Sequence, residues 1–193
     1  MRLLLITNDY PPKPGGIQQY LGNIISVYPD EWHVIAPADA AAEYDERVSR
    51  HHTAFMWPTP QVGAWIQDRA ADFGPDVILF GAPYPLPFLG PGLRERLKVP
   101  YGILSHGAEV TLPAAAPGTR QAIAKALRDA DVRFAVSRFT AGRVQKLTGR
   151  DVVFVGAGVD ITTFTPPPNG NLSLIHISEP TRLDLASRIP SSA

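Results

Sequence analysis

The sequence predicts an α/β domain in which a parallel β-sheet carries helices on both faces. Short apolar runs, each bounded by polar or turn residues, alternate along the chain with stretches whose apolar residues recur at helical spacing. This alternation favours a parallel sheet, because each helix carries the chain back to the start of the next strand. Since such crossovers are right-handed, the predicted fold is Rossmann-like.

The first strand and the first helix are predicted from the opening residues. Residues 3–7 form a largely apolar run, typical of a strand that is buried on both faces. Residues 17–27 follow with apolar side chains on one helical stripe, entered through the chain-breaking residues Pro14, Gly15 and Gly16. Further strands are predicted at 32–36, 77–80, 101–104, 132–136 and 152–155, and further helices at about 61–73, 86–97, 118–129 and 138–147.

Composition excludes several classes of function. The 193 residues include 18 Lys and Arg against 18 Asp and Glu, so the chain has no overall field to attract nucleic acid, and we expect no nucleic-acid partner. The absence of Cys excludes disulfides, iron–sulfur clusters and Cys-type zinc sites. No apolar run approaches the ~18 residues of a membrane span. The expected location is therefore the cytoplasm.

The last part of the chain differs in composition from the rest. Residues 1–171 contain four Ser, whereas the last 22 residues contain five. The change follows Pro166-Pro167-Pro168-Asn169-Gly170, a cluster that ends regular structure. Residues 172–182 also resemble a translation of the transposon-end adaptor used in sequencing libraries. We therefore expect a domain over 1–168 and a non-native, disordered tail over 169–193.

The loop after the first predicted strand is a candidate phosphate site. In an open parallel sheet, ligands bind beyond the carboxyl ends of the strands. The paired Gly15 and Gly16 would let the backbone approach a ligand at the start of a helix, where free N–H groups favour phosphate. The alternative is an ordinary strand–helix turn. Neither a Walker loop nor a Gly-x-Gly-x-x-Gly fingerprint is present.

Two later loops also follow strands. His106 and Glu109 come directly after the strand at 101–104, which places an imidazole and a carboxylate at the ligand-binding edge. The alternative for His106 is a surface or core histidine without a catalytic role. Residues 156–160 contain two Gly, but no helix is predicted after them, so that loop is interpreted as an exit turn.

Two further patterns suggest metal sites only superficially. Asp129 and Asp131 match an Asp-x-Asp motif, yet they lie between a predicted helix and a predicted strand, where a helix stop is the simpler interpretation. His51 and His52 are sequence neighbours, whose side chains would diverge in a helix or a strand. We therefore expect no metal.

The neutral total hides a basic segment. Residues 120–150 contain eight basic and two acidic residues, a net charge of +6. Such a segment could face phosphates or anionic lipid headgroups. The alternative is a solvated helical face, since spacing alone does not bring these charges to one side.

Several motifs in chain order together resemble the N-terminal half of the family 4 glycosyltransferases, which are retaining enzymes of the GT-B fold. The resemblance covers Arg2 to Pro166. Its motifs are Asn8-Asp9-Tyr10-Pro11-Pro12 with Gly15-Gly16-Ile17-Gln18, Phe80-Gly81-Ala82, Ser105-His106-Gly107-Ala108-Glu109, Val136-Ser137-Arg138-Phe139-Thr140, and Gly158-Val159-Asp160 with Phe164 and Pro166. The opening is most similar to the GDP-mannose-dependent phosphatidylinositol monomannoside mannosyltransferases, although Ala108 stands where that group has a second His.

The resemblance implies roles for particular residues. Gly15 and Gly16 would face the donor diphosphate, and His106 would be the catalytic residue near the transferred sugar. Further residues would line the cleft on the acceptor side, namely Asn8, Asp9, Tyr10, Gln18, Glu109, Ser137 and Arg138. The expected partners are a nucleotide sugar, as substrate rather than cofactor, and an anionic lipid acceptor at the inner face of the plasma membrane.

The resemblance also implies a missing part. In this family a second Rossmann domain holds most of the nucleotide sugar, so this chain alone is expected to be inactive. The function expected is mannose transfer from GDP-mannose to a phosphatidylinositol mannoside-type lipid. Two alternatives stay open at this stage: a family 4 enzyme with a different donor, and a non-catalytic Rossmann-like nucleotide-binding domain.

Overall fold

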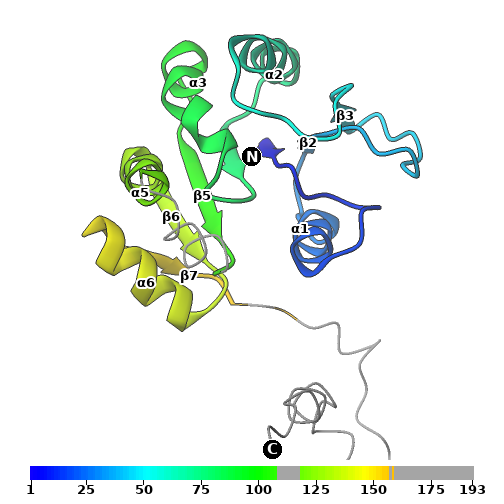
Figure 1. Ribbon diagram of the computed structural model, residues 1–193. Coiled ribbons are helices and arrows are strands. Elements are labelled where there is room, and N and C mark those ends of the chain that lie inside the picture. The colour runs from blue at the N-terminus through cyan, green and yellow to red at the C-terminus, as the bar shows by residue number, and fades with distance from the viewer. Residues whose placement is uncertain (108–117, 157, 159–193) are drawn as a thin grey trace, which may run out of the picture. The chain divides into compact units, whose positions relative to one another are not determined.

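The computed structural model describes residues 1–107, 118–156 and 158, and its sheet has seven parallel strands (Figure 1). The strand order is β3-β2-β1-β4-β5-β6-β7. The register pairs Leu3 of β1 with Trp32 of β2 on one side and with Val77 of β4 on the other. The strands are β1 (Leu3–Ile6), β2 (Trp32–Ala36), β3 (Val48–Arg50), β4 (Val77–Phe80), β5 (Tyr101–Ser105), β6 (Val132–Ala135) and β7 (Val153–Phe154).

Helices cover both faces of the sheet, as the sequence predicts. The helices are α1 (Gly16–Ser26), α2 (Pro60–Phe73), the 3₁₀ helix η1 (Leu86–Leu89), α3 (Gly90–Leu97), α5 (Thr119–Asp129) and α6 (Arg138–Thr148). Helix α1 packs on one face, and α2, α3, α5 and α6 pack on the other (Figure 1). From β1 to β2, the chain moves along the sheet in one direction, and from β3 to β7 it moves in the opposite direction. Because the crossovers are right-handed, the helix that connects β1 to β2 lies on the opposite face from the helices that connect the later strands.

The central strand β1 is buried on both faces, which explains its unbroken apolar run. Leu3 and Leu5 point to the face of α1 and pack on Leu21 and Ile25. Leu4 and Ile6 belong to the core on the other face, together with residues of α2. Each fully buried aliphatic side chain contributes about 1.5–3 kcal/mol of hydrophobic free energy. Both faces therefore require apolar side chains at successive positions.

The structure departs from the predicted elements in two places. Strand β3 was not predicted, because Val48–Arg50 is a three-residue edge strand without a buried side chain. The helix predicted at 86–97 is divided into η1 and α3 at Gly90. A Cβ at Gly90 would lie 2.6 Å from the ring of Tyr101, so the close contact between α3 and β5 requires glycine at this position.

The described residues up to Gly156 form one compact unit. The predicted boundary at residue 168, the predicted tail and Glu109 lie outside the described residues, so these remain predictions. In the part of the chain that the structure describes, no helix is both long enough and apolar enough to cross a membrane.

Candidate functional site

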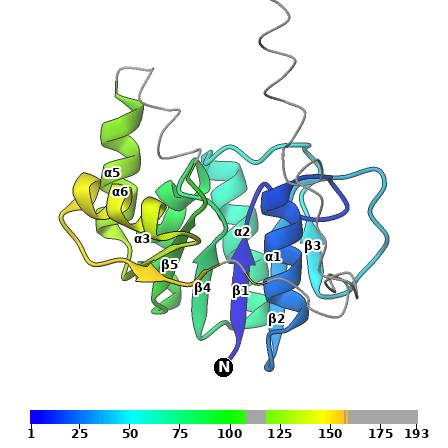
Figure 2. The same cartoon turned by 90° about the horizontal axis from the view of Figure 1, so that it is seen from below.

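The strand order locates the candidate site. The order reverses at β1, which lies between β2 and β4, and ligands of such sheets bind at this switch point, beyond the carboxyl ends of the strands. Figure 2 shows the sheet from the side, with the strands pointing away from the N-terminus. The loops after β1, β4 and β5 follow neighbouring strands, so they lie together at the carboxyl edge.

The loop after β1 is held by hydrogen bonds around Asp9. The buried Thr7 accepts a hydrogen bond at its Oγ1 from the Asp9 backbone N–H at 2.9 Å. Gln18 of α1 donates from Nε2 to Asp9 Oδ1 at 2.7 Å. The same carboxylate oxygen lies 3.8 Å from Lys13 Nζ. Asp9 and Gln18, both predicted to be cleft residues, therefore also tie the loop to the first turn of α1.

The start of α1 presents backbone N–H groups to solvent. Gly15 and Gly16 are both exposed, and no side chain caps the helix at Gly15. Uncapped N–H groups at the positive end of a helix favour an anion. The two glycines differ, however. A Cβ at Gly15, which has a φ of 152°, would lie 2.1 Å from Gln18 Oε1, whereas a Cβ at Gly16 would meet nothing within 4 Å.

His106 connects several loops at the carboxyl edge. Its Nε2 lies 2.8 Å from the carbonyl oxygen of Gly81, after β4. A carbonyl can only accept, so Nε2 carries the proton, and a neutral His106 is unprotonated at Nδ1. The ring of Tyr20 meets that of His106 edge to face at 5.5 Å, and Tyr20 donates from its hydroxyl to the Gly156 carbonyl at 2.6 Å. His106 is thus half-buried between the Gly81 carbonyl after β4 and the Tyr20 ring of α1, and Tyr20 in turn is hydrogen-bonded to the segment after β7.

Tyr20 was missed by sequence reasoning, which interpreted it only as part of the apolar stripe of α1. Its position four residues after Gly16 places it one helical turn further from the helix start. Burial raises the pKa of its hydroxyl above 10.0. Gly81 also positions His106, because a Cβ there would lie 2.7 Å from Thr7 Oγ1 and 2.8 Å from Leu21 Cδ1. Only glycine lets the β4 loop approach β1 so closely.

The loop after β5 packs against the start of α6. A Cβ at Gly107, whose φ is 124°, would lie 3.1 Å from Thr140 Oγ1. Ser137 caps α6 by accepting at Oγ from the Thr140 backbone N–H at 3.0 Å. The guanidinium of Arg138 lies 5.1 Å from the ring centroid of Phe154. Ser137 and Arg138, both predicted cleft residues, therefore have structural contacts of their own. Ser105 Oγ is buried and has no hydrogen-bond partner among the described residues.

Asn8 has a structural contact that the sequence did not indicate. Its side-chain Nδ2 donates to the Met56 carbonyl at 3.1 Å, and its Oδ1 accepts from the Met56 N–H at 2.8 Å. Both residues are buried. The Asn8 amide therefore fastens the segment between β3 and α2 to the loop after β1.

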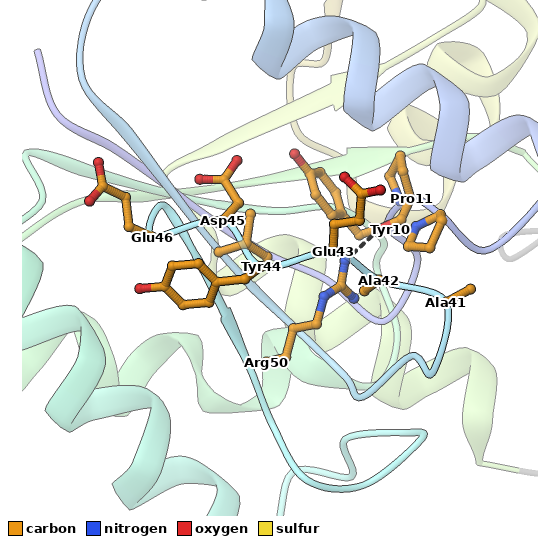
Figure 3. Close-up of a pocket in the computed structure, with 11 residues that line it drawn as sticks. Tyr10, Pro11, Ala41, Ala42, Glu43, Tyr44, Asp45, Glu46 and Arg50 are labelled. Atoms are coloured by element: carbon orange, nitrogen blue, oxygen red, sulfur yellow. Dashed lines mark hydrogen bonds between the residues drawn. The ribbon is translucent and has the colours of Figure 1, made fainter.

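Tyr10, the remaining described cleft residue, lines an open cavity of about 650 Å³ (Figure 3). The cavity lies between the loop after β1 and residues 41–46, and Glu43, Asp45 and Glu46 supply its carboxylates. Arg50 of β3, which also lines the cavity, donates from Nη2 to the Pro11 carbonyl at 2.6 Å and so connects β3 to the loop after β1. Burial, and then the charge of Asp45, raise the pKa of the Tyr10 hydroxyl.

The Asp-x-Asp pattern has a structural role. Asp131 accepts from the Tyr101 N–H at 2.9 Å and from Arg94 at 3.1 Å, and Asp129 pairs with Lys125. Both carboxylates precede β6, at the amino edge of the sheet.

The expectation that the neighbouring His51 and His52 side chains diverge was wrong. Their ring centroids are 4.2 Å apart, because the two residues lie just beyond β3 in irregular structure. Burial of His51, and then the charge of His52, lower the pKa of the His51 imidazole. Among the described residues, no three His, Asp or Glu side chains group as metal ligands would.

Comparison with known proteins identifies the family. The model of Glycosyltransferase Family 4 matches residues 14–163, which include the start of α1, His106 and the beginning of α6. The chain belongs to this family. It spans about half the length of the curated relatives that it matches.

Two relatives illustrate the similarity of this family 4 chain. A Mycolicibacterium smegmatis protein named GDP-mannose-dependent alpha-(1-6)-phosphatidylinositol monomannoside mannosyltransferase is 36% identical over 179 residues, which cover 86% of the chain and 47% of the relative. A Corynebacterium glutamicum protein, named as the mannosyltransferase for the monoacylated form of that lipid, is 30% identical, with 86% and 46% coverage.

Solved structures confirm the fold prediction. Anabaena HepE in complex with UDP-glucose matches with a TM-score of 0.67 and 18% identity, over 96% of the chain and 50% of HepE. The apo form of the lipopolysaccharide outer core galactosyltransferase WaaB matches with a TM-score of 0.57 and 12% identity, over 89% of the chain and 50% of WaaB. The chain therefore has the architecture of the N-terminal half of a GT-B glycosyltransferase.

Proposed function

We propose that the chain is the acceptor-side half of a retaining mannosyltransferase, which moves mannose from GDP-mannose to a phosphatidylinositol mannoside-type lipid at the inner face of the plasma membrane. The observation that carries the proposal is the meeting of His106, Tyr20 and Gly81 at the carboxyl edge, one helical turn from the exposed Gly15–Gly16 start of α1. The names of four curated relatives, 30–36% identical to the chain, support the donor and the acceptor.

Each group at this edge has a proposed task. The N–H groups at the start of α1 stabilise the negative charge that develops on the departing diphosphate. His106 contacts the transferred mannose, with its ring fixed by the Gly81 carbonyl and Tyr20. Asp9 and Gln18 hold the loop that carries Gly15 and Gly16. The Tyr10 cavity receives the polar part of the acceptor, whose hydroxyl groups can donate to Glu43 and Asp45.

The substrates can be tested with a completed enzyme, defined as residues 1–166 of this chain joined to the C-terminal half of the M. smegmatis relative. We expect transfer from GDP-mannose to phosphatidylinositol monomannoside, measured with radiolabelled mannose and extraction of the lipid product. Free mannose and lipid without inositol serve as control acceptors. Transfer to these controls at the same rate, or to no lipid acceptor, would contradict the proposed acceptor.

Gly15 and Gly16 provide a matched pair of variants. Gly15→Ala is expected to lower the stability of this chain by roughly 1–3 kcal/mol, because its backbone is strained for other residues and its Cβ collides with Gln18. Gly16→Ala should leave stability unchanged or raise it by up to about 1 kcal/mol. Thermal unfolding measures both effects.

The two variants separate structure from ligand contact. If diphosphate approaches the backbone at Gly16, Gly16→Ala should weaken GDP-mannose binding by the completed enzyme about tenfold, although the protein itself tolerates the methyl group. Unchanged donor affinity in a stable Gly16→Ala enzyme would remove this glycine from the donor site.

A further inference from the structure

Four aromatic side chains form an exposed patch at the carboxyl edge of the sheet. The aromatic patch consists of Phe55, Trp57, Tyr84 and Phe88, which are 39%, 53%, 37% and 39% exposed. Successive ring centroids are 4.9, 6.3 and 5.8 Å apart, so the rings form a continuous row. Two rings come from the segment between β3 and α2, and two come from the segment after β4. Figure 2 shows the first segment crossing the carboxyl edge of the sheet.

The patch rests on a fixed base. Met56, between Phe55 and Trp57, is fully buried and is held by both hydrogen bonds of the Asn8 amide. Between Tyr84 and Phe88, Leu86 and Pro87 are buried. In both segments, buried residues lie between the two exposed aromatic residues, so the backbone that carries the rings is anchored.

An apolar groove continues from the patch. It has a volume of about 400 Å³, lies between α2 and α3, and begins at Phe88. Its lining is mostly small or aliphatic, and Gln67 and Arg96 add polar groups. The small or aliphatic residues are Pro60, Gly63, Ala64, Leu89, Gly92 and Leu93. The exposed rings and the groove together form a contiguous apolar surface, whereas most exposed apolar residues of a protein are scattered singly. A contiguous apolar surface of this kind marks an interaction site.

The chemistry of this edge fits a membrane surface. Trp and Tyr concentrate at the boundary between lipid and water, because their rings are apolar and carry one polar group. Exposed Arg120 and Arg138 lie at the starts of α5 and α6, at the same edge of the sheet, where they can attract anionic headgroups. Within the described part of the chain, neither Arg120 nor Arg138 forms an ion pair.

We propose that the aromatic patch docks into the interfacial layer of a bilayer that contains anionic lipid. The choice of a bilayer rather than a protein partner rests on the proposed lipid acceptor. Docking through this patch turns the carboxyl edge, with His106 and the start of α1, toward the layer where the acceptor headgroup lies. Asn8 is then a positioning residue for the patch, since it holds the backbone between Phe55 and Trp57.

Vesicle binding tests this proposal without any measurement of sugar transfer. The 193-residue chain is sedimented with vesicles of phosphatidylcholine alone or with phosphatidylinositol added. We expect stronger partitioning onto the anionic vesicles, and a roughly tenfold or larger loss for the double variant Trp57→Ala/Phe88→Ala. The control is Val27→Ala at the end of α1, which removes an exposed apolar side chain (78% exposed) at the opposite, amino edge of the sheet and should leave partitioning unchanged.

Fluorescence adds a second readout. Trp57→Phe keeps an aromatic ring in the patch, so vesicle binding should persist. The blue shift of tryptophan emission on vesicle binding should be lost, even though Trp32 and Trp65 remain in the chain. Equal partitioning of the double variant and the wild-type chain, or no partitioning onto either vesicle, would overturn the proposal. Self-association that the double variant abolishes would assign the patch to a second copy and would also overturn it. Intact vesicle binding by a completed enzyme that transfers no mannose would instead overturn the proposed function alone.

Discussion

The chain alone is expected to transfer no measurable mannose from GDP-mannose, and the completed enzyme is expected to gain that activity. A retaining transfer develops positive charge on the sugar and negative charge on the departing diphosphate, so its rate depends on hydrogen-bond donors preorganised around the diphosphate. In the described part of the chain, the start of α1 is the group proposed for this task. Losing one such donor can cost about 10²–10³ in rate, and the family resemblance implies that several lie in the other half.

The measurement is radiolabelled mannose transfer at equal molar concentrations of the chain and the completed enzyme. The completed enzyme with Gly15→Ala provides a comparison in which the start of α1 is disturbed while the second half is present. Turnover by the chain alone would contradict the division of labour proposed between the two halves. Inactivity of a correctly folded completed enzyme would contradict the proposal that this chain supplies the acceptor side.

His106→Ala is expected to lower kcat of the completed enzyme by about 10²–10³, the usual range for losing a positioned group that acts in the transition state. The imidazole is half-buried and held from two sides, by the Gly81 carbonyl at 2.8 Å and by the Tyr20 ring. A side chain fixed in this way can contact the transferred sugar without losing further rotational freedom on binding.

Two variants distinguish catalysis from structure at this position. Tyr20→Phe removes the 2.6 Å hydrogen bond to the Gly156 carbonyl but keeps the ring against His106, so its effect on kcat should be much smaller. His52→Ala removes another exposed imidazole and should change neither kcat nor KM. A His106→Ala enzyme that folds normally and keeps wild-type kcat would remove His106 from the mechanism.

The centre of the sheet could be predicted because strands such as β1 and β5 are buried on both faces, which requires continuous apolar runs in the sequence. β3 could not be predicted, since an edge strand of three half-buried residues leaves no apolar pattern. The division at Gly90 depends on the ring of Tyr101 approaching from another strand, and no local signal encodes that contact.

The candidate site was predictable to the extent that it depends on loops after strands. Gly15, Gly16 and His106 follow β1 and β5, and the topology brings these ends to one edge. Tyr20 was not predicted, because a half-buried tyrosine on a helical stripe has the same pattern as a core residue. The two hydrogen bonds between Asn8 and Met56 join residues 48 positions apart, and the aromatic patch depends on that contact.

Hydrogen–deuterium exchange of the completed enzyme, with and without GDP-mannose and the phosphatidylinositol monomannoside acceptor, tests most directly the claim that the carboxyl edge of this domain faces the substrates. The measurement needs no turnover, since it reports protection of backbone N–H groups on binding. Within residues 1–156, we expect protection to concentrate in the loop after β1, the first turns of α1 and the segment around His106. Unchanged exchange in these segments with both substrates bound, or protection at the amino edge around Asp131 and Pro100 instead, would contradict the account.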